Sequence, residues 1–313
     1  MIQIVRYTAE RAKEWNDFVA SSKNATFLFN RSYMDYHSDR FHDHSLLFYL
    51  DNRLYALLPA NVAGDTLYSH QGLSYGGLVV CSKATALNCC QMFESLAHYL
   101  RAHGIKRVCY KPMAWPYRDS PSEEDLYALF YSCRARVISR DVASFIDLQN
   151  RMAFSELRRR CARKAQKRGL TACQTSDFEG FWNILTQNLS AKYHAAPVHT
   201  LEEITMLSGR FPDNIRLFAC YDGDEMLGGT VLYLTKHVAK MQYISASPKG
   251  KDCGALDCLF DWLINGDVLS QRYCDMGTSA VSHDSNQVNE SLIFQKEGFG
   301  ARAVCYDEYE WEL

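Results

Sequence analysis

The hydrophobic pattern of the first half of the chain predicts a β-hairpin flanked by helices. Residues 45–51 and 53–62 are largely apolar runs around an Asp51-Asn52 turn, which is typical of two antiparallel strands. Residues 2–6 predict a strand, and apolar positions at helical spacing within 9–21 predict an amphipathic helix. After the hairpin come a predicted strand at 67–70, a glycine-rich stretch at 72–80, a helix at 84–101, a strand at 105–111, a helix at 122–132 and strands at 134–139 and 142–148.

The second half of the chain repeats this order of elements. A hairpin is predicted from 216–222 and 226–234, around the turn Asp222-Gly223-Asp224. It is followed by a predicted strand at 239–247, a loop at 248–255, a helix at 255–269, a short strand at 272–277, a helix at 288–297 and a final strand at 301–311. Sequence identity between the halves is low, so the repeat is one of pattern. Hairpins layered with helices predict the α/β class, and more narrowly α+β.

Length and charge favour a globular chain of two domains. The 313 residues carry 34 Lys+Arg against 36 Asp+Glu, and 47% of them are apolar. Domains of about 150 residues are typical, so we expect domains at 1–152 and 153–313. This balance excludes a histone-like polycation, and no DNA partner is expected. No apolar run reaches the roughly 18–20 residues of a membrane span, and the first residues do not resemble a secretory signal.

Cysteine and histidine spacing gives no sign of a metal site. Twelve cysteines are scattered through apolar segments without any Cys-x-x-Cys spacing, which predicts reduced thiols and a cytoplasmic protein. The best histidine cluster is His37, His42 and His44, which has no pattern of cysteines or carboxylates around it. We interpret it as a solvated loop, and expect neither a bound metal nor a permanently bound cofactor.

A basic segment separates the two halves. Seven of the eleven residues at 158–168 are Arg or Lys, and Ser155 and Gly169 are plausible ends of a helix. One interpretation is a solvated helix that connects two domains. The other, compatible with it, is a contact for a polyanion such as a nucleotide diphosphate, the phosphates of CoA or an RNA backbone. The residues assigned to that contact are Arg158, Arg159, Arg163, Lys167 and Arg168.

Three stretches resemble one family of proteins. They are the basic segment RRRCARKAQKRGL (158–170), the run AKMQYISASPKGKDCGALDCLFDWLI (239–264), and CDMGTS (274–279) with VNESLIFQKEGFGA (288–301). Together with the repeated order of elements, they resemble the tandem GNAT arrangement of Fem-type peptidyltransferases. The resemblance implies two GNAT-like domains, each a mixed and mainly antiparallel sheet flanked by helices.

The resemblance also implies a donor site in the second domain. A GNAT domain holds its donor where two parallel strands splay apart, here expected between 239–247 and 272–276. The pyrophosphate of an acyl-CoA would then lie on the start of the next helix, where N–H groups and the helix dipole favour anions. The residues expected there are Lys249, Gly250, Lys251, Gly254 and Ala255. Asp252 stands where the family has its first glycine, so a glycine-rich turn that caps the helix is the alternative. The first half has no such glycine pair, and we expect it to shape the acceptor cleft.

Acyl transfer to an amine needs proximity, a base, a donor to the oxyanion and a proton for the leaving group. Tyr243 could supply the proton, and Asp275 could orient the amine or act as base. The alternatives are an aromatic residue of the sheet and a side chain that closes a turn. Met241, Tyr243 and Ser245 are expected on one face of their strand. The resemblance implies that Lys296 polarises the donor carbonyl.

Two further residues are candidates for binding the acceptor. His194 lies in the segment 191–200 together with His199 and could act as a base near neutral pH, or lie on a surface loop. Asn289 could contact substrate, or only cap the last helix.

The function expected from these observations is N-acyl transfer. The donor would be acyl-CoA, as a co-substrate, or aminoacyl-tRNA, and the acceptor a small-molecule or peptidoglycan-precursor-like amine. The alternative is a catalytically inert GNAT-like module that binds a nucleotide-sugar or peptidyl ligand between its domains.

Overall fold

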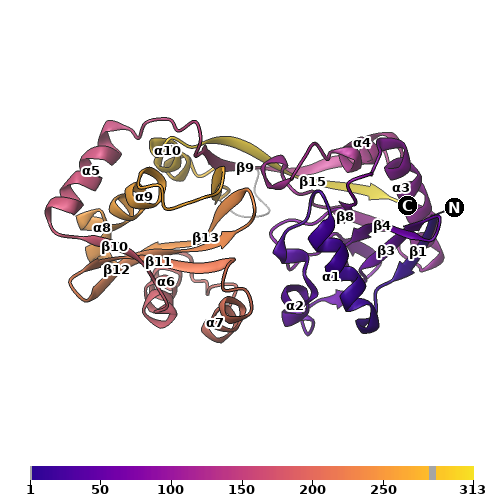
Figure 1. Cartoon of the computed structure of the whole chain (residues 1–313), viewed down its shortest axis with the longest axis horizontal. Coiled ribbons are helices and arrows are strands. Elements are labelled where there is room, and N and C mark those ends of the chain that lie inside the picture. The colour runs from indigo at the N-terminus through magenta and orange to yellow at the C-terminus, as the bar shows by residue number, and fades with distance from the viewer. Residues whose placement is uncertain (1, 282–286) are drawn as a thin grey trace. The chain divides into compact units, whose positions relative to one another are not determined.

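The computed structural model describes residues 2–281 and 287–313, which fall into two compact units (Figure 1). Unit 1 comprises Met1–Asp141 and Cys305–Leu313, and unit 2 comprises Val142–Val304. Strands β9 (Arg136–Asp147) and β15 (Arg302–Glu312) each begin in one unit and end in the other. The units therefore differ from the domains expected at 1–152 and 153–313. The last segment belongs to unit 1 because the end of β15 pairs with strand β8 (Arg107–Tyr110) there.

Unit 1 contains two groups of hydrogen-bonded strands. The first has the order β1-β3-β4-β7 and is antiparallel, and the second has the order β15-β8-β6-β5-β2, in which only β6 and β8 are parallel. Its further strands are β1 (Ile2–Arg6), β2 (His42–Asp43), β3 (Leu46–Leu50), β4 (Arg53–Leu58), β5 (Asn61–Ala63), β6 (Thr66–Tyr68) and β7 (Val79–Val80). Its helices are α1 (Ala12–Ser21), α2 (Arg31–Met34), α3 (Ala86–Ala102) and α4 (Glu124–Tyr131), with short 3-10 turns at Ala9–Arg11, Phe27–Phe29, Asp35–His37 and Trp115–Tyr117.

The hairpin predicted in the first half is confirmed as β3 and β4. Asp51 and Asn52 at its turn have φ of 49° and 63°, the left-handed geometry that a two-residue hairpin turn requires. The strands predicted at 134–139 and 142–148 are instead the single strand β9. Arg140, near the expected break, forms a two-bonded ion pair with Asp307 of β15.

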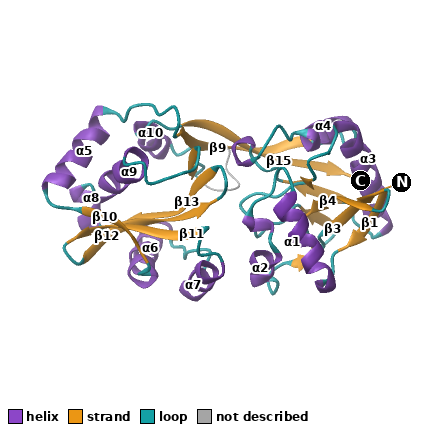
Figure 2. Ribbon diagram, in the orientation of Figure 1, coloured by secondary structure: helices purple, strands orange, loops and turns teal. Residues whose placement is uncertain are grey.

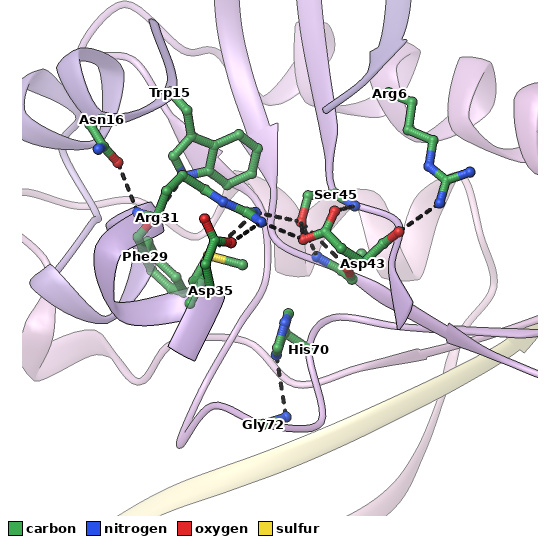
Figure 3. Close-up of polar contacts among 12 residues, drawn as sticks. Arg6, Trp15, Asn16, Phe29, Arg31, Asp35, Asp43, Ser45, His70 and Gly72 are labelled. Atoms are coloured by element: carbon green, nitrogen blue, oxygen red, sulfur yellow. Dashed lines mark hydrogen bonds and ion pairs between the residues drawn. The ribbon is translucent and has the colours of Figure 1, made fainter. Parts of the chain in front are cut away.

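An ion-pair network around a buried arginine joins α2 to β2 in unit 1 (Figure 3). The side chain of Arg31 is only 5% exposed, and its Nη2 atom lies 2.5 Å from Asp35 and 2.8 Å from Asp43. The guanidinium also lies 3.7 Å above the ring of Tyr7. Asp43 accepts a further hydrogen bond from the amide of Ser45, at 2.9 Å. Each charge in this network therefore has a partner, as burial demands.

The histidines of the expected solvated loop are mostly buried. His37 stacks on His70, with ring centroids 5.3 Å apart, whereas His44 lies against Tyr99 and His103. Burial lowers the pKa of both His37 and His44, which favours their neutral form. The interpretation as a solvated loop is wrong for these two residues. Among residues 2–281 and 287–313, no group of three or more His, Cys, Asp or Glu is placed to hold a metal ion.

Unit 2 is a mixed sheet covered by helices on both faces (Figure 2). Its strand order is β10-β11-β12-β13-β14-β9, and only β13 and β14 are parallel. Helices α6 and α7 pack on one face, and α9, backed by α5, packs on the other. The strands are β10 (Thr171–Thr175), β11 (Ile215–Asp222), β12 (Glu225–Leu234), β13 (Val238–Ala246) and β14 (Tyr273–Thr278). The helices are α5 (Glu156–Lys167), α6 (Phe178–Tyr193), α7 (Leu201–Arg210), α8 (Pro248–Cys253), α9 (Ala255–Asn265) and α10 (Glu290–Gly298).

The core of unit 2 forms beneath α9. Leu259, Phe260 and Leu263 of this helix are buried against Leu232 of β12 and Phe299 after α10. Their spacing of one, three and four residues puts them on one side of the helix, which is why the segment folds as predicted. In the part of the chain that the structure describes, no helix has the length and apolarity needed to cross a bilayer.

Candidate functional site

Strands β13 and β14 diverge after a short stretch of pairing. Residues 238–240 of β13 pair with 273–275 of β14, and their pairing ends there. A cavity of about 600 Å³ opens beyond this point, bordered by α6, α8, α9 and α10 as well as by both strands. This confirms the predicted gap between 239–247 and 272–276. Its polar lining residues are Asn188, Lys192, Ser245, Lys251, Gln295 and Lys296.

The edge of β13 that faces the cavity offers backbone hydrogen-bonding groups. The amide of Ser247 donates to the backbone oxygen of Leu227 on β12, at 2.9 Å. Backbone groups alternate in direction along a strand, so those of Ala246 and Ile244 point the other way, toward the gap. Asn188 of α6 already donates to the carbonyl of Ala246, at 2.7 Å. The edge can therefore pair with an extended, amide-containing ligand.

A β-bulge changes which side chains of β13 share a face. Tyr243 and Met241 lie opposite consecutive residues of β12, which leaves Gln242 as the extra residue. Met241 therefore packs in the core beneath α9, whereas Tyr243 contacts Trp182 of α6. The prediction that Met241 shares a face with Tyr243 and Ser245 is wrong, because the extra residue reverses the alternation between them.

Tyr243 forms a close pair with a histidine. Its hydroxyl lies 2.5 Å from Nδ1 of His199, and its ring meets the edge of Trp182 at 5.1 Å. His199 is buried, whereas His194, the predicted candidate, is exposed at the C-terminal end of α6 with φ of 50°. The sequence places both histidines in one segment, and only the packing around Trp182 distinguishes them. Tyr243 is not among the residues that line the cavity.

Asp275 is fully buried at the point where the strands diverge. One carboxylate oxygen lies 3.2 Å from Nζ of Lys240, and the other accepts a hydrogen bond from the amide of Gly277 at 2.7 Å. The second contact is the turn closure named as the alternative role. Asp275 thus supports one wall and does not line the cavity.

Lys296 of α10 lines the cavity and holds the end of β14 in place. Its Nζ donates to the carbonyls of Gly277 and Thr278, at 2.8 and 2.7 Å, and to the hydroxyl of Ser279, at 3.0 Å. The residue is only 4% exposed, and burial, more than any neighbouring charge, lowers the pKa of Lys296 to about 8. Three acceptors around one amine favour its protonated form at neutral pH.

The segment expected to be an open loop at 248–255 starts with the helix α8 instead. Ser247 caps this helix, because its hydroxyl accepts a hydrogen bond from the amide of Gly250 at 3.0 Å. A Cβ atom on Gly250 would lie 2.1 Å from a backbone oxygen of β12, so this glycine permits close packing of helix on strand. Gly254 has φ of 80° and joins α8 to α9, which begins at Ala255. The glycines thus serve packing and a helix junction.

The two lysines of α8 point to different partners. Lys249 forms ion pairs with Asp222 and Glu225 near the hairpin turn, at 3.0 and 2.6 Å. Lys251 donates to the side-chain oxygen of Asn188 at 2.7 Å and lines the cavity. Of these two candidates, the structure brings only Lys251 to the cavity.

Asn289 and Arg158 have structural partners within unit 2. The side chain of Asn289 accepts a hydrogen bond from the amide of Leu292 at 3.1 Å and so caps α10. Arg158 lies 3.1 Å from Asp257 and 5.1 Å above the ring of Phe299. The contact of Asn289 matches its alternative role as a cap, whereas Arg158 is packed within unit 2 and is not part of a solvated surface.

The rest of the basic segment forms an exposed cationic face on α5. The helix buries Ala162 and Ala165 on the side that packs against α9. Arg159 pairs with Glu156 at 2.8 Å. Five basic residues of this segment are exposed: Arg160, Arg163, Lys164, Lys167 and Arg168. We call them the α5 cationic face.

The fold is shared with solved structures, although sequence comparison finds nothing similar. No family model and no curated protein matches this sequence. The structure titled FemX matches 99% of this chain and 97% of its own, with 12% identity and a TM-score of 0.67. L-PGS from Bacillus licheniformis matches 98% and 92%, with 13% identity and a TM-score of 0.63. A tandem GNAT protein from the clavulanic acid biosynthesis pathway matches 100% and 98%, with 11% identity and a TM-score of 0.52.

These similarities define the class of fold. The chain has the tandem GNAT-like, Fem-like fold that its sequence resembles, with two GNAT-like domains of mixed α/β structure. At identities of 11–13% the comparison concerns the fold alone.

Proposed function

We propose that this protein is an N-acyltransferase that holds its donor in the cavity of unit 2. The observation that carries this proposal is the cavity itself, which opens where β13 and β14 diverge. An edge of backbone groups lies on one side of it, and Lys296 on the other. Such an edge suits an extended donor arm, and a cation suits the oxyanion that forms on an acyl carbonyl. The donor is an acyl-CoA or an aminoacyl-tRNA, and the acceptor is a small-molecule or peptidoglycan-precursor-like amine.

The reaction would proceed by direct attack. The acceptor nitrogen bonds to the donor carbonyl carbon, and the bond from that carbon to sulfur, or to the ester oxygen of a tRNA, breaks. The proton lost by the amine passes to the leaving group. Tyr243 and His199 lie 2.5 Å apart but do not line the cavity, so the proton is taken to pass directly from the amine to the leaving group. Asp275 keeps Lys240 and the turn at Gly277 in place beside the cavity.

The proposal is tested by incubating the protein with acyl-CoA and aminoacyl-tRNA donors and a panel of amines. The amines include free amino acids, polyamines and peptidoglycan-precursor peptides. We expect an amide product, detected by mass spectrometry, that depends on the protein. Donor binding without any amide product would contradict the proposal.

A binding module without catalysis is the second candidate. It is favoured by the start of α8, where the hydroxyl of Ser247 occupies the amide of Gly250 and Lys249 is held by two carboxylates, so that these groups are less available to the pyrophosphate of an acyl-CoA donor. The two candidates are separated by thermal unfolding with CoA, acetyl-CoA and nucleotide-sugars, since a ligand of the folded state raises the melting temperature. A nucleotide-sugar that stabilises the protein, together with thioesters that do not, would favour the module.

The α5 cationic face is expected to contact a phosphate-bearing substrate. Changing Arg163, Lys167 and Arg168 to glutamine should weaken binding to tRNA and lower the slope of log K against log salt by about 2–3, because each lost phosphate contact removes about 0.7–0.9. The matched control changes three exposed cations of unit 1, Arg53, Lys83 and Arg101, and should leave the slope unchanged. If the slope of log K against log salt were the same in both variants, the α5 cationic face would not contact phosphate and α5 would only connect the two halves of the chain.

A further inference from the structure

The walls of the unit 2 cavity are mainly apolar. Six of the lining side chains come from four different elements of the unit: Leu185, Leu189, Ile244, Leu256, Phe260 and Met276. The volume of about 600 Å³ lies in the range of sites that enclose a small-molecule ligand, roughly 300–1,000 Å³. Burying a short polar group such as acetyl would leave most of this apolar surface uncovered. The shape and lining therefore suit a larger apolar group.

The charged side chains of the cavity all have one sign. Lys192, Lys251 and Lys296 line it, and none of its described lining residues is Asp or Glu. The carboxylate beside Lys296 belongs to Asp275, which is fully buried and held by Lys240. A ligand that brought an ammonium group into this cavity would meet like charges across apolar walls. An uncharged chain with anionic groups near the lysines meets no such cost.

We propose that the acyl group taken up here is an uncharged apolar chain, longer than acetyl and carried as a thioester, and that it is not an aminoacyl group. This inference rests on the proposed function and narrows its donor. In the transfer, the acceptor nitrogen forms a bond to the thioester carbonyl carbon and the carbon–sulfur bond breaks. The amine proton goes to the leaving thiolate, so no other reactant is needed. The thioester is carried by CoA or by the same pantetheine arm on a carrier protein.

The test is a binding series that needs no acceptor. Straight-chain acyl-CoAs from acetyl to dodecanoyl are titrated by calorimetry. We expect the affinity to rise about fourfold for each methylene until the cavity is full, as burial of apolar surface requires. An affinity that does not change with chain length would overturn the proposal. The same acyl groups on pantetheine identify the carrier, because equal affinity without the nucleotide favours a carrier protein and weaker affinity favours CoA.

Charge is tested with a pair of donors of the same shape. Heptanoyl-CoA and 6-aminohexanoyl-CoA differ only in whether the chain ends in a methyl or an ammonium group. We expect the ammonium form to bind at least about tenfold more weakly, because it adds a positive charge to a cavity whose described lining residues include three lysines and no Asp or Glu. Equal or tighter binding of the ammonium form would overturn the assignment of an uncharged chain.

The position of the acyl chain is tested with a variant that fills part of the cavity. Leu189, half-buried on α6, is changed to tryptophan, which should shorten the chain length that binds best. The control places tryptophan at Val198, which is 75% exposed and outside the cavity, and should leave the series unchanged. Urea unfolding of both variants shows that each is folded. A chain-length preference that Leu189→Trp does not alter would place the acyl chain elsewhere and overturn the proposal.

These results separate this inference from the proposed function. If acyl chains bind in the expected series but no amine is acylated, the transferase proposal fails and the ligand assignment stands. If aminoacyl-tRNA is consumed while chain length has no effect, transfer stands and the ligand assignment is overturned.

Discussion

Changing Lys296 to methionine is expected to lower turnover of the proposed transfer by about 10–100-fold, because it removes a positive charge beside the oxyanion; the effect is that of the charge alone, since all three N–H donors of the amine already bind protein acceptors. The amine of Lys296 borders the cavity. Three hydrogen bonds, to Gly277, Thr278 and Ser279, hold it in place. Methionine keeps the length of the side chain but removes both the charge and these bonds. Two backbone carbonyls would lose their donor, which typically costs about 1–3 kcal/mol of stability for each buried group.

From the lowered pKa of Lys296 we expect stability and turnover to change with pH in opposite directions. Burial lowers the pKa of Lys296 from 10.5 to about 8, so between these pH values the unfolded chain binds more protons than the folded one. The free energy of unfolding should therefore rise with pH across this window, by up to about 3 kcal/mol. Turnover should fall across the same window, because the amine loses its charge.

The variant and a neighbouring control separate these effects. Lys296→Met should show neither the rise in stability nor the fall in turnover. Gln295→Met, at the next position of α10 and also lining the cavity, should keep both. Turnover is measured per folded molecule, with urea unfolding at each pH. Unchanged turnover of folded Lys296→Met would move the chemistry to the pair of Tyr243 and His199.

The order of elements could be predicted from the sequence because its signals are local. The turns at Asp51-Asn52 and around Gly223, which has φ of 58°, mark hairpins whatever surrounds them. The bulge at Gln242 could not be predicted, because it depends on how β13 aligns with β12. It decides which side chains of β13 face α6. One extra residue thus changes the site without changing the sequence pattern.

The start of α8 shows how a local signal can mislead. A proline and two glycines within Pro248–Gly254 favour a loop when read alone. In the structure the proline is the first helical residue, Ser247 caps the helix, and Gly250 lets it approach β12. The packing role of Gly250 depends on the neighbouring strand and could not be read from the local sequence, whereas the phosphate role predicted for these glycines stays a prediction.

The roles of some site residues depend on partners that are close in sequence, and the roles of others on partners that are distant. Asn289 was recognisable as a possible cap because its partner lies three residues away. The contacts of Lys249 with Asp222 and of His199 with Tyr243 join segments more than 25 residues apart, at distances that only the folded chain sets. Lys296 was reached through resemblance alone, since nothing in its local sequence indicates burial.

Changing Arg31 to methionine is expected to destabilise unit 1 by about 1.5–3 kcal/mol, the usual contribution of hydrogen bonds to charged groups, because the buried guanidinium is lost while its two carboxylate partners stay partly exposed. Arg31 is the common partner of Asp35 and Asp43 (Figure 3). Its guanidinium also lies 3.7 Å above the ring of Tyr7. Without it, Asp43, whose side chain is 28% exposed, loses its ion-pair partner. The change is read from urea unfolding as a lower midpoint with little change in slope.

The matched control is an exposed pair in the same unit. Lys13 and Asp17 form an ion pair on α1 whose side chains are 87% and 65% exposed, so Lys13→Met should cost less than about 0.5 kcal/mol. Adding Asp43→Asn to Arg31→Met should recover part of the loss, because asparagine keeps an oxygen for the amide of Ser45 without a buried charge. If Arg31→Met cost no more than Lys13→Met, the network would not be a source of stability. If the double variant were no more stable than Arg31→Met, the loss would come from the packing of the guanidinium on Tyr7 rather than from the uncompensated carboxylate.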